Sequence, residues 1–320
     1  MIGVFLDQAT VHPEDIDFSP LENVLSQWSY YPITASDKEV IDRIKHADVV
    51  ITNKVVLTDF ILSQAKHLKL ICIAATGTNN IALETAYNLG IPVCNVPNYC
   101  TASVTEHVFT LILALTKRLN PLIQAVVHGA WQKSPHFTLL DFPCRELKGK
   151  TLGIIGYGEL GKSVARVAQA FGMNILIAQR ANSPVQRDRI PLKNLLPQVD
   201  ILSLHCPLTP DTQGLINKET LGLMRSNALL INTARGGIVD EAALVHALRN
   251  GKLGGAGIDV LSQEPPKDNH PLLAPDIPNL ILTPHVAWNS REARQNLIYQ
   301  VADNIQNFLM RAPKNIVNKY

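Results

Sequence analysis

The chain has 320 residues, of which 46% are hydrophobic and 18% are charged, and its 29 Lys and Arg against 27 Asp and Glu give a net charge of +2. This composition is typical of a globular protein with enough apolar material for two cores. Because there is no basic run or tail, the charge argues against nucleic acid or a membrane surface as an electrostatic partner.

The first residues, MIGVFLDQ, lack the pattern of a signal peptide, and no apolar stretch reaches membrane-spanning length. The five cysteines are odd in number and widely spaced, as expected of reduced thiols, and none has metal-ligand spacing. We therefore expect a cytoplasmic protein without a metal site.

The first hundred residues alternate short apolar runs with segments of helical period, a pattern typical of a parallel sheet with crossover helices. The loops after two of the runs hold Asn53-Lys54 and ATGTNN, at the strand ends where open α/β sheets bind ligands. Turn chemistry alone explains the second loop equally well, because Gly, Thr and Asn all favour turns. The strands are predicted at 2–6, 49–51, 70–74 and 91–95, and the helices at 36–45, 58–65 and 81–89.

Near residue 100 the pattern changes to one long helix, predicted over 102–119, with an apolar face wide enough for full burial. Residues 120–150 follow as a weakly periodic stretch that is too long for a compact loop and too apolar for a linker. We expect this arm to pack against a second subunit, which predicts a homodimer. Folding back onto its own domain is the alternative.

A second alternating series opens with the apolar run 152–155, the loop GYGELG and a helical pattern over 162–171. In a G-x-G-x-x-G loop the first glycine turns sharply, the second admits a pyrophosphate to the backbone, and the third lets helix and strand pack closely. A simple tight turn is the alternative, but the strands that follow favour a dinucleotide-binding domain. They are predicted at 174–178, 200–204, 228–232, 255–260 and 280–283, with helices at 241–250 and 290–309.

Arg235, Glu264 and His285 each follow a predicted strand, so all three are expected at the carboxyl edge of one sheet. Arginine suits a substrate carboxylate because its planar fork makes two charge-assisted hydrogen bonds. Histidine can pass a proton to a carbonyl oxygen, and a neighbouring carboxylate favours its protonated form. Taken singly, each residue has an alternative role: Arg235 in a surface ion pair, Glu264 as a solvated loop residue, and His285 as a core histidine.

The motifs GYGELG, NTARGGIVDE, DVLSQEPP and TPHVAW, with ATGTNNI and SVTEH upstream, resemble the D-isomer-specific 2-hydroxyacid dehydrogenase family over nearly the whole chain. Within it, TNKVVLT, AATGTNNI, LLDFP and HCPLTPDT are most similar to glycerate dehydrogenases, also called hydroxypyruvate reductases. The resemblance implies two doubly wound parallel-sheet α/β domains with a cleft between them. It makes residues 1–99, completed by the tail 287–320, a flavodoxin-like catalytic domain, and residues 100–286, with a dimerisation arm at about 120–150, a Rossmann NAD(P)-binding domain.

The same resemblance implies the roles of single residues. Arg235 holds the substrate's carboxylate and carbonyl, His285 is the acid/base, and Glu264 pairs with His285. Further substrate contacts fall on Lys54, Thr76, Gly77, Thr78 and Tyr99. Cofactor contacts fall on Thr105, Gly156, Gly158, Glu159, Leu160, Gly161, Gln179, Arg180, Cys206, Pro207, Thr212, Thr233, Ala234, Arg235, Asp259 and His285, with Asp259 meeting the nicotinamide carboxamide.

Three residues at two sites depart from the family pattern. Glu159 stands where the family often has arginine, so backbone amides must hold the pyrophosphate. Gln179 and Arg180 stand where an NAD-specific site has an acidic residue for the adenine ribose, which leads us to expect use of NADH and NADPH. Arg180 pointing into solvent is the alternative.

The sequence therefore predicts an enzyme that transfers a hydride from NADH or NADPH to a small 2-oxo acid, converting hydroxypyruvate or glyoxylate to D-glycerate or glycolate. A preference for another 2-oxo acid is one alternative. A dinucleotide-sensing, corepressor-like binding protein is another, although the complete set of Arg235, Glu264 and His285 favours an enzyme.

Overall fold

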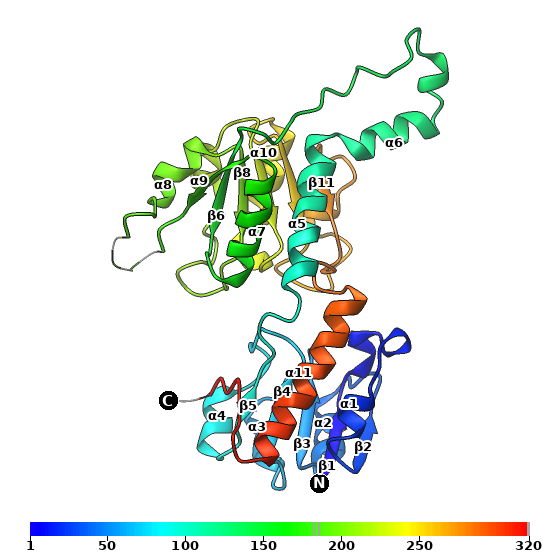
Figure 1. Ribbon diagram of the computed structural model, residues 1–320, viewed down its shortest axis with the longest axis vertical. Helices are drawn as coiled ribbons and strands as arrows, with labels where there is room; N and C mark the ends of the chain where they lie inside the picture. Colours follow the sequence, from blue (N-terminus) through cyan, green and yellow to red (C-terminus); the bar gives the residue numbers. More distant parts are fainter. Residues whose placement is uncertain (181, 183, 185, 319–320) are drawn as a thin grey trace. The chain divides into compact units, whose positions relative to one another are not determined.

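The computed structural model describes residues 1–180, 182, 184 and 186–318, and divides the chain into two compact units (Figure 1). The first unit comprises Met1–Cys100 together with the tail that begins at Trp288, and the second comprises Thr101–Ala287. The last two residues of the predicted tail 287–320 lie outside the described residues. The assignment of the two units to substrate and cofactor stays a prediction.

The first unit contains a five-stranded parallel sheet in the order β2-β1-β3-β4-β5. This is the flavodoxin-like order, and its switch point lies between β1 and β3. The predicted strands correspond to β1, β3, β4 and β5, whereas β2 was missed because its sequence QWSY forms a partly exposed edge strand without an apolar run. The strands are β1 (Ile2–Phe5), β2 (Gln27–Tyr30), β3 (Val49–Thr52), β4 (Leu70–Ile73) and β5 (Val93–Cys94).

Short helices with side-chain caps connect these strands. The Ser36 side chain accepts a hydrogen bond from the Glu39 amide and Thr58 accepts one from the Ile61 amide, which satisfies free amides at two helix starts. The apolar faces of these helices pack with the buried strands β3 and β4 in one core. The helices of this unit are α1 (Ser19–Glu22), α2 (Asp37–Ile44), α3 (Asp59–Gln64), α4 (Leu83–Asn88) and α11 (Arg291–Leu309).

The C-terminal helix α11 packs against α1 and β4 of the first unit. Its Arg294 is 6% exposed and forms a two-pronged contact with Asp15, with Nη2 2.8 Å from Asp15 Oδ2. Arg294 Nη1 also donates to the carbonyl of His12 at 2.9 Å. This one side chain therefore fastens the turns that follow β1 to the tail of the chain.

Asp15→Asn tests this contact. The Arg294 hydrogen bond lowers the pKa of the Asp15 carboxyl to about 2 from its ordinary 3.8, so the ion pair stabilises the fold above the unfolded-state pKa and is lost as pH falls through the folded-state pKa. We expect the variant to melt a few degrees below the wild-type protein at neutral pH and the difference to narrow below about pH 4. Thermal unfolding followed by circular dichroism measures this, and a pH-independent difference would contradict it.

The second unit contains a six-stranded parallel sheet in the order β11-β10-β9-β8-β6-β7. The predicted doubly wound α/β architecture is thereby confirmed for both units. The first strand, β6, lies between β7 and β8, so one strand fewer lies on the β7 side than in the 3-2-1-4-5-6 order of dinucleotide-binding folds. The strands are β6 (Thr151–Ile155), β7 (Asn174–Ile177), β8 (Ile201–Leu204), β9 (Leu229–Asn232), β10 (Gly255–Ile258) and β11 (Leu280–Leu282).

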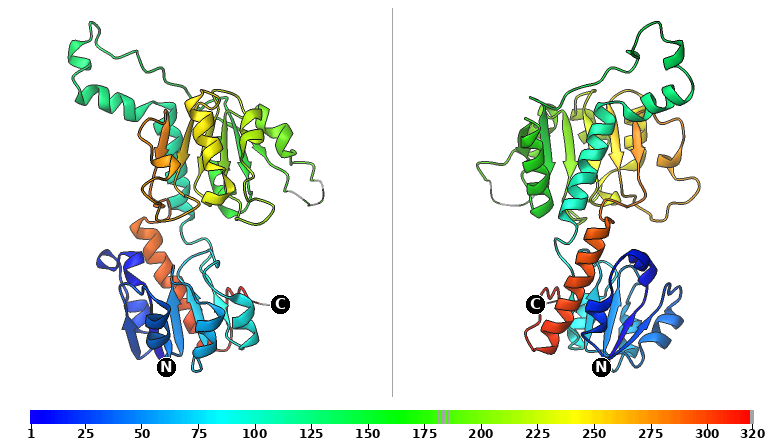
Figure 2. Two further views of the ribbon diagram at one scale, coloured as in Figure 1. Left: turned by 180° about the vertical axis from the view of Figure 1, so that it is seen from behind. Right: turned by 45° about the vertical axis from the view of Figure 1, so that its right-hand side comes forward.

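Helices cover both faces of this sheet (Figure 2). On one face α5 packs against α7 and β10, so closely that a Cβ at Gly257 would lie 2.9 Å from Leu111. The long helix ends earlier than predicted, at Thr116, because Arg118 adopts a left-handed backbone with φ of 55°. The helices are α5 (Thr101–Thr116) and α7 (Glu159–Ala170) on this face, and α8 (Leu192–Leu195), α9 (Lys218–Leu223) and α10 (Glu241–Arg249) on the other.

The two sheets share one device at the amino ends of their strands. In the first unit, Asp48 before β3 accepts from the Ile2 amide at 2.7 Å and pairs with Lys69 at 2.8 Å. In the second unit, Asp200 before β8 accepts from the Thr151 amide at 2.9 Å and pairs with Arg225 at 3.2 Å. Asp48 thus connects the amino ends of β1, β3 and β4, and Asp200 those of β6, β8 and β9.

The arm begins with α6 (Leu119–Val127) and projects from the body of the second unit (Figure 1). Within the described part of the chain no single helix is long and apolar enough to cross a membrane, and only α5 and α6 taken together, bent by 60°, pass that test. Half of the α5 residues are buried within the unit. The arm carries seven exposed apolar side chains: Leu119, Ile123, Val126, Val127, Trp131, Phe137 and Leu140.

Candidate active site

The glycine loop lies at the switch point of the second sheet, where the chain leaves β6 beside β8. The His205 amide donates to the Ile155 carbonyl at 2.7 Å, which brings the two loops together. A Cβ at Gly156 would lie 2.5 Å from the Cys206 nitrogen, and the backbone here has φ of +91°. Only glycine therefore fits at this position.

The other two glycines of the loop have different surroundings. A Cβ at Gly158 would meet nothing within 4 Å, whereas a Cβ at Gly161 would lie 2.2 Å from the Gly156 carbonyl oxygen. The helix α7 starts at Glu159, earlier than predicted, with Gly158 as its N-cap, and no side chain caps its first amides. This fits a phosphate cradle, because a helix N-terminus with free amides attracts an anion.

A second observation fits a bound dinucleotide. The Thr233 hydroxyl, in the loop after β9, is buried without a hydrogen-bond partner among the described residues. Buried polar atoms are nearly always satisfied, so this oxygen needs a group that the protein itself does not supply. We propose that the ribose or nicotinamide end of the cofactor supplies it.

His285 and Glu264 form a close pair after β11 and β10. The His285 Nδ1 lies 2.6 Å from Glu264 Oε2, and Glu264 Oε1 accepts from the Leu261 amide at 2.8 Å. Because an ionised carboxylate only accepts, Nδ1 carries the hydrogen of this bond and the exchangeable position of the ring is Nε2. The His285 backbone is left-handed, with φ of 55°, so the surrounding structure must hold it in place.

Asp259 supplies that hold. Its carboxylate is buried and accepts from the amides of Val286 and Ala287, both at 2.9 Å, and from the Thr283 hydroxyl at 2.6 Å. Burial disfavours the ionised form, yet hydrogen bonds from His107, Thr283 and the two amides keep the pKa of Asp259 below its ordinary value. Both carboxylate oxygens are thus engaged inside the protein, and the predicted contact with a carboxamide stays a prediction.

Arg235 lies on a turn that Asn232 builds at the end of β9. The Asn232 side chain accepts from the Ala234 amide at 3.0 Å and donates to the Arg235 carbonyl at 2.9 Å. A Cβ at Gly236 would lie 1.9 Å from the Leu261 carbonyl carbon, so this turn packs directly on the loop that leads to Glu264. The structure therefore brings Arg235, Glu264 and His285 to one edge of one sheet, as expected.

The predicted substrate residues of the first unit follow β3, β4 and β5. The buried carboxylate of Asp7, after β1, accepts from the amides of Asn53, Lys54 and Val55, the shortest being 2.6 Å to Lys54. Burial raises the pKa of Asp7, against the effect of these bonds. Sequence reasoning missed Asp7, His107 and the buried position of Asp259, because their partners lie in other loops. It also missed the role of Asn232, although the partners of this side chain lie in its own turn.

The remaining predicted cofactor residues occupy several environments. The Thr105 hydroxyl is buried and bonds to Thr101 and Ser163, and the Thr212 hydroxyl donates to the Pro207 carbonyl, so each has a packing or turn role here. Burial raises the pKa of the Cys206 thiol to about 11, which keeps it protonated. Cofactor contacts of these residues stay predictions, as do those of Leu160, Pro207, Ala234, Gln179 and Arg180.

His285 bonds to a carboxylate through one ring nitrogen and lies on the sheet edge that carries the glycine loop. This arrangement is typical of dehydrogenases, which transfer a proton and a hydride in one reaction. Residues 109–287 match the NAD-binding domain of the D-isomer specific 2-hydroxyacid dehydrogenases. The chain belongs to this family and is an oxidoreductase that uses a nicotinamide dinucleotide.

Similar proteins extend over the full chain. A glycerate dehydrogenase of Methylorubrum extorquens is 44% identical over 98% of both chains, and a hydroxypyruvate reductase of Blautia hydrogenotrophica is 37% identical over 99% of both. Among solved structures, an acyclic imino acid reductase in complex with NADPH and D-arginine superposes with a TM-score of 0.86 at 28% identity, covering 99% of this chain and 100% of that one.

Two glycine substitutions separate the cradle from the fold. Gly158→Val places its side chain in open space, so we expect an unfolding midpoint close to that of the wild-type protein and NADH affinity reduced by about tenfold or more. Gly161→Ala collides with the Gly156 carbonyl and should destabilise the unit by about 1–3 kcal/mol. NADH fluorescence titration and thermal unfolding measure the two effects. Undiminished NADH affinity of Gly158→Val would contradict the cradle.

Proposed function

We propose that this enzyme reduces hydroxypyruvate to D-glycerate, and glyoxylate to glycolate. The observation that carries the proposal is the 2.6 Å contact between His285 and Glu264 on the sheet edge that bears the glycine loop. Full-length similarity to a glycerate dehydrogenase and a hydroxypyruvate reductase supports the choice of substrate.

His285 is the proton donor in this proposal. With Nδ1 bonded to Glu264, the imidazolium gives its Nε2 proton to the carbonyl oxygen, and Glu264 stabilises the positive charge before transfer. When bound, the dinucleotide supplies the hydride that reduces the carbonyl carbon. In the opposite direction neutral Nε2 accepts the proton of the 2-hydroxy group.

Arg235 orients the substrate. Its guanidinium offers two parallel N–H groups to the carboxylate of a 2-oxo acid, and the Asn232 turn holds its backbone. We propose that Lys54, Tyr99 and the backbone of residues 76–78 also contact the substrate. The Asp7 carboxylate would then keep the loop of Lys54 in place.

Reduction of 2-oxo acids by the purified protein, and by His285→Asn, tests the proposal. We expect the wild-type protein to oxidise the reduced cofactor fastest with hydroxypyruvate and more slowly with glyoxylate. The variant should lose about 10²–10⁴-fold in kcat, because it lacks a titratable proton donor. Absorbance at the reduced nicotinamide band measures both.

The control for this experiment is NADH binding to His285→Asn, which should match that of the wild-type protein. Near-normal turnover of the variant would remove His285 from its proposed role. A larger kcat/KM for pyruvate or a bulkier acid would assign another substrate, and binding of NADH without turnover of any acid would leave a sensing protein.

We further propose that the enzyme is a cytoplasmic homodimer held together through its arm. The arm exposes seven apolar side chains to solvent, and exposed apolar side chains that lie together mark surfaces for association with another protein. All five cysteines are free thiols, as a reducing compartment requires.

Val127→Asp combined with Phe137→Asp tests the dimer. These side chains are 71% and 91% exposed, so charges there cost the monomer little and should break an apolar interface. Light scattering coupled to gel filtration should give twice 35.2 kDa for the wild-type protein and 35.2 kDa for the variant. Ile33→Asp, at a 70% exposed position of the first unit, is the matched control and should stay dimeric.

A further inference from the structure

A cation lies beside the glycine loop and has no role in the function derived so far. The Ile190 amide donates to the Ile177 carbonyl at 2.9 Å, and the Gln179 amide donates to the Ile190 carbonyl at 2.8 Å. These bonds hold Ile190 beside the end of β7, and they therefore place Arg189, the residue before it, next to that strand end. Its guanidinium carbon lies 4.7 Å from the ring centroid of Tyr157, the residue between the first two glycines.

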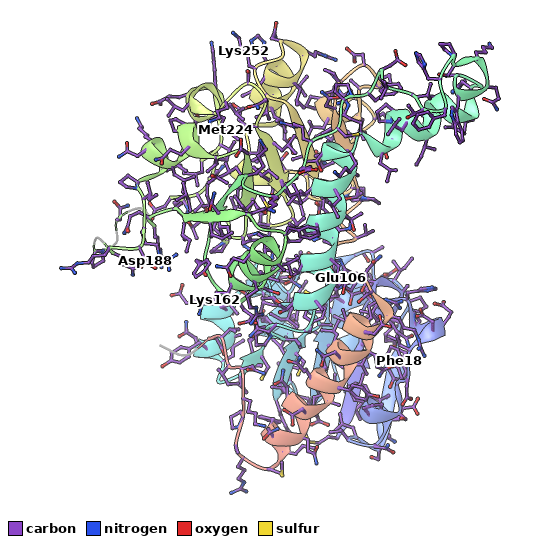
Figure 3. The ribbon with its side chains drawn as sticks, turned by 45° about the horizontal axis from the view of Figure 1, so that its top comes forward. Phe18, Glu106, Lys162, Asp188, Met224 and Lys252 are labelled. Carbon is purple, nitrogen blue, oxygen red and sulfur yellow. The ribbon has the colours of Figure 1, made fainter. Side chains whose placement is uncertain are left out.

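The hydrogen bonding of this guanidinium is incomplete. Arg189 Nη1 is buried and has no hydrogen-bond partner in the described part of the chain, although Nε donates to Gln186 Oε1 at 3.1 Å. The Asp188 carboxylate lies 3.7 Å from Arg189 Nε and its side chain is 68% exposed, so the ion pair is weak. Figure 3 shows Asp188 at the outer edge of the second unit. A buried charged donor without a partner indicates a place for an anion.

The neighbourhood identifies the anion. At the end of the second strand of a dinucleotide-binding domain, an acidic residue accepts hydrogen bonds from the adenine ribose of NAD. Gln179 stands there instead, and its side-chain amide donates to the Pro184 carbonyl at 2.9 Å, so it supports the loop after β7. With Arg180 as the next residue, no carboxylate at these two positions would repel a phosphate on the ribose.

We propose that Arg189, held against the ring of Tyr157, binds the 2′-phosphate of NADPH, and that the enzyme consequently prefers NADPH to NADH. Contact with the ring occupies one face of the guanidinium and leaves the N–H groups, which point outward in the plane of the guanidinium, for phosphate oxygens. Tyr157 is thus a positioning residue for Arg189. The preference for NADPH in catalysis rests on the proposed function. The phosphate site itself uses only residues of the second unit and can be tested by binding alone.

Calorimetric titration with two adenosine nucleotides tests the inference independently of turnover. Adenosine 2′,5′-bisphosphate carries the 2′-phosphate, and 5′-AMP lacks it. We expect the wild-type protein to bind the bisphosphate at least about tenfold more tightly than 5′-AMP, and Arg189→Gln to lose about tenfold to a hundredfold of the bisphosphate affinity while keeping that for 5′-AMP.

Three further variants make the experiment specific. Tyr157→Leu removes the ring and should lower the bisphosphate affinity, whereas Tyr157→Phe keeps the ring face and should restore it. Arg187→Gln removes an exposed positive charge from the same loop and should change the affinity by less than about twofold. Circular dichroism confirms that each variant is folded.

Several results would overturn the proposal. Equal affinity of the wild-type protein for both nucleotides would remove the 2′-phosphate site, and an equal loss for both in Arg189→Gln would assign the arginine to the pyrophosphate. A loss in Arg187→Gln as large as in Arg189→Gln would indicate general electrostatic attraction. If hydroxypyruvate is not reduced with either cofactor but the nucleotides are discriminated, the proposed function fails and the phosphate site stands.

Discussion

The buried carboxylate of Asp259 joins the ends of two strands, and the geometry of the Glu264–His285 pair depends on it. The amides of Val286 and Ala287, which follow His285, donate to the carboxylate oxygens of Asp259. These bonds hold the left-handed backbone of His285, whose imidazole contacts Glu264. Hydrogen bonds offset the desolvation of this charge, so it stays ionised inside the unit. The proposed proton donor therefore has its position set by a residue that need not touch substrate.

The same principle recurs at each ligand loop. Asp7 gathers three amides of the loop after β3, and Asn232 folds the turn that bears Arg235. In the second unit the glycine loop is pressed against the loop after β8, with no room for a side chain at Gly156. In each unit, parallel strands bring the loops of that unit to one edge of its sheet, and buried polar groups hold the loops in place.

The sequence predicted the parts of this structure whose signals are local. Apolar runs located β1, β3 and β4, and the spacing of glycines located the turn between β6 and α7. The edge strand β2 has no such run, so it was not predicted. The left-handed backbone of Arg118, which ends α5, does not alter the helical spacing of apolar residues, so the earlier end of the helix was not predicted either. Position after a predicted strand located Arg235, Glu264 and His285. In contrast, Asp7 and Arg189 could not be found, because their partners lie 46 and 32 positions away in the sequence.

Asp48 and Asp200 occupy equivalent places in the two sheets and show that each sheet separates the contacts that stabilise it from the loops proposed to bind ligands. They hold the amino ends of the strands with ion pairs and amide contacts, at the opposite edge from every loop proposed to meet a ligand. Mutations that alter the stability of the fold can accumulate at the amino edge without changing substrate selectivity at the carboxyl edge. For an enzyme whose relatives differ in substrate, such a division makes the scaffold easy to reuse, since a lineage can exchange its chemistry while keeping its heat tolerance.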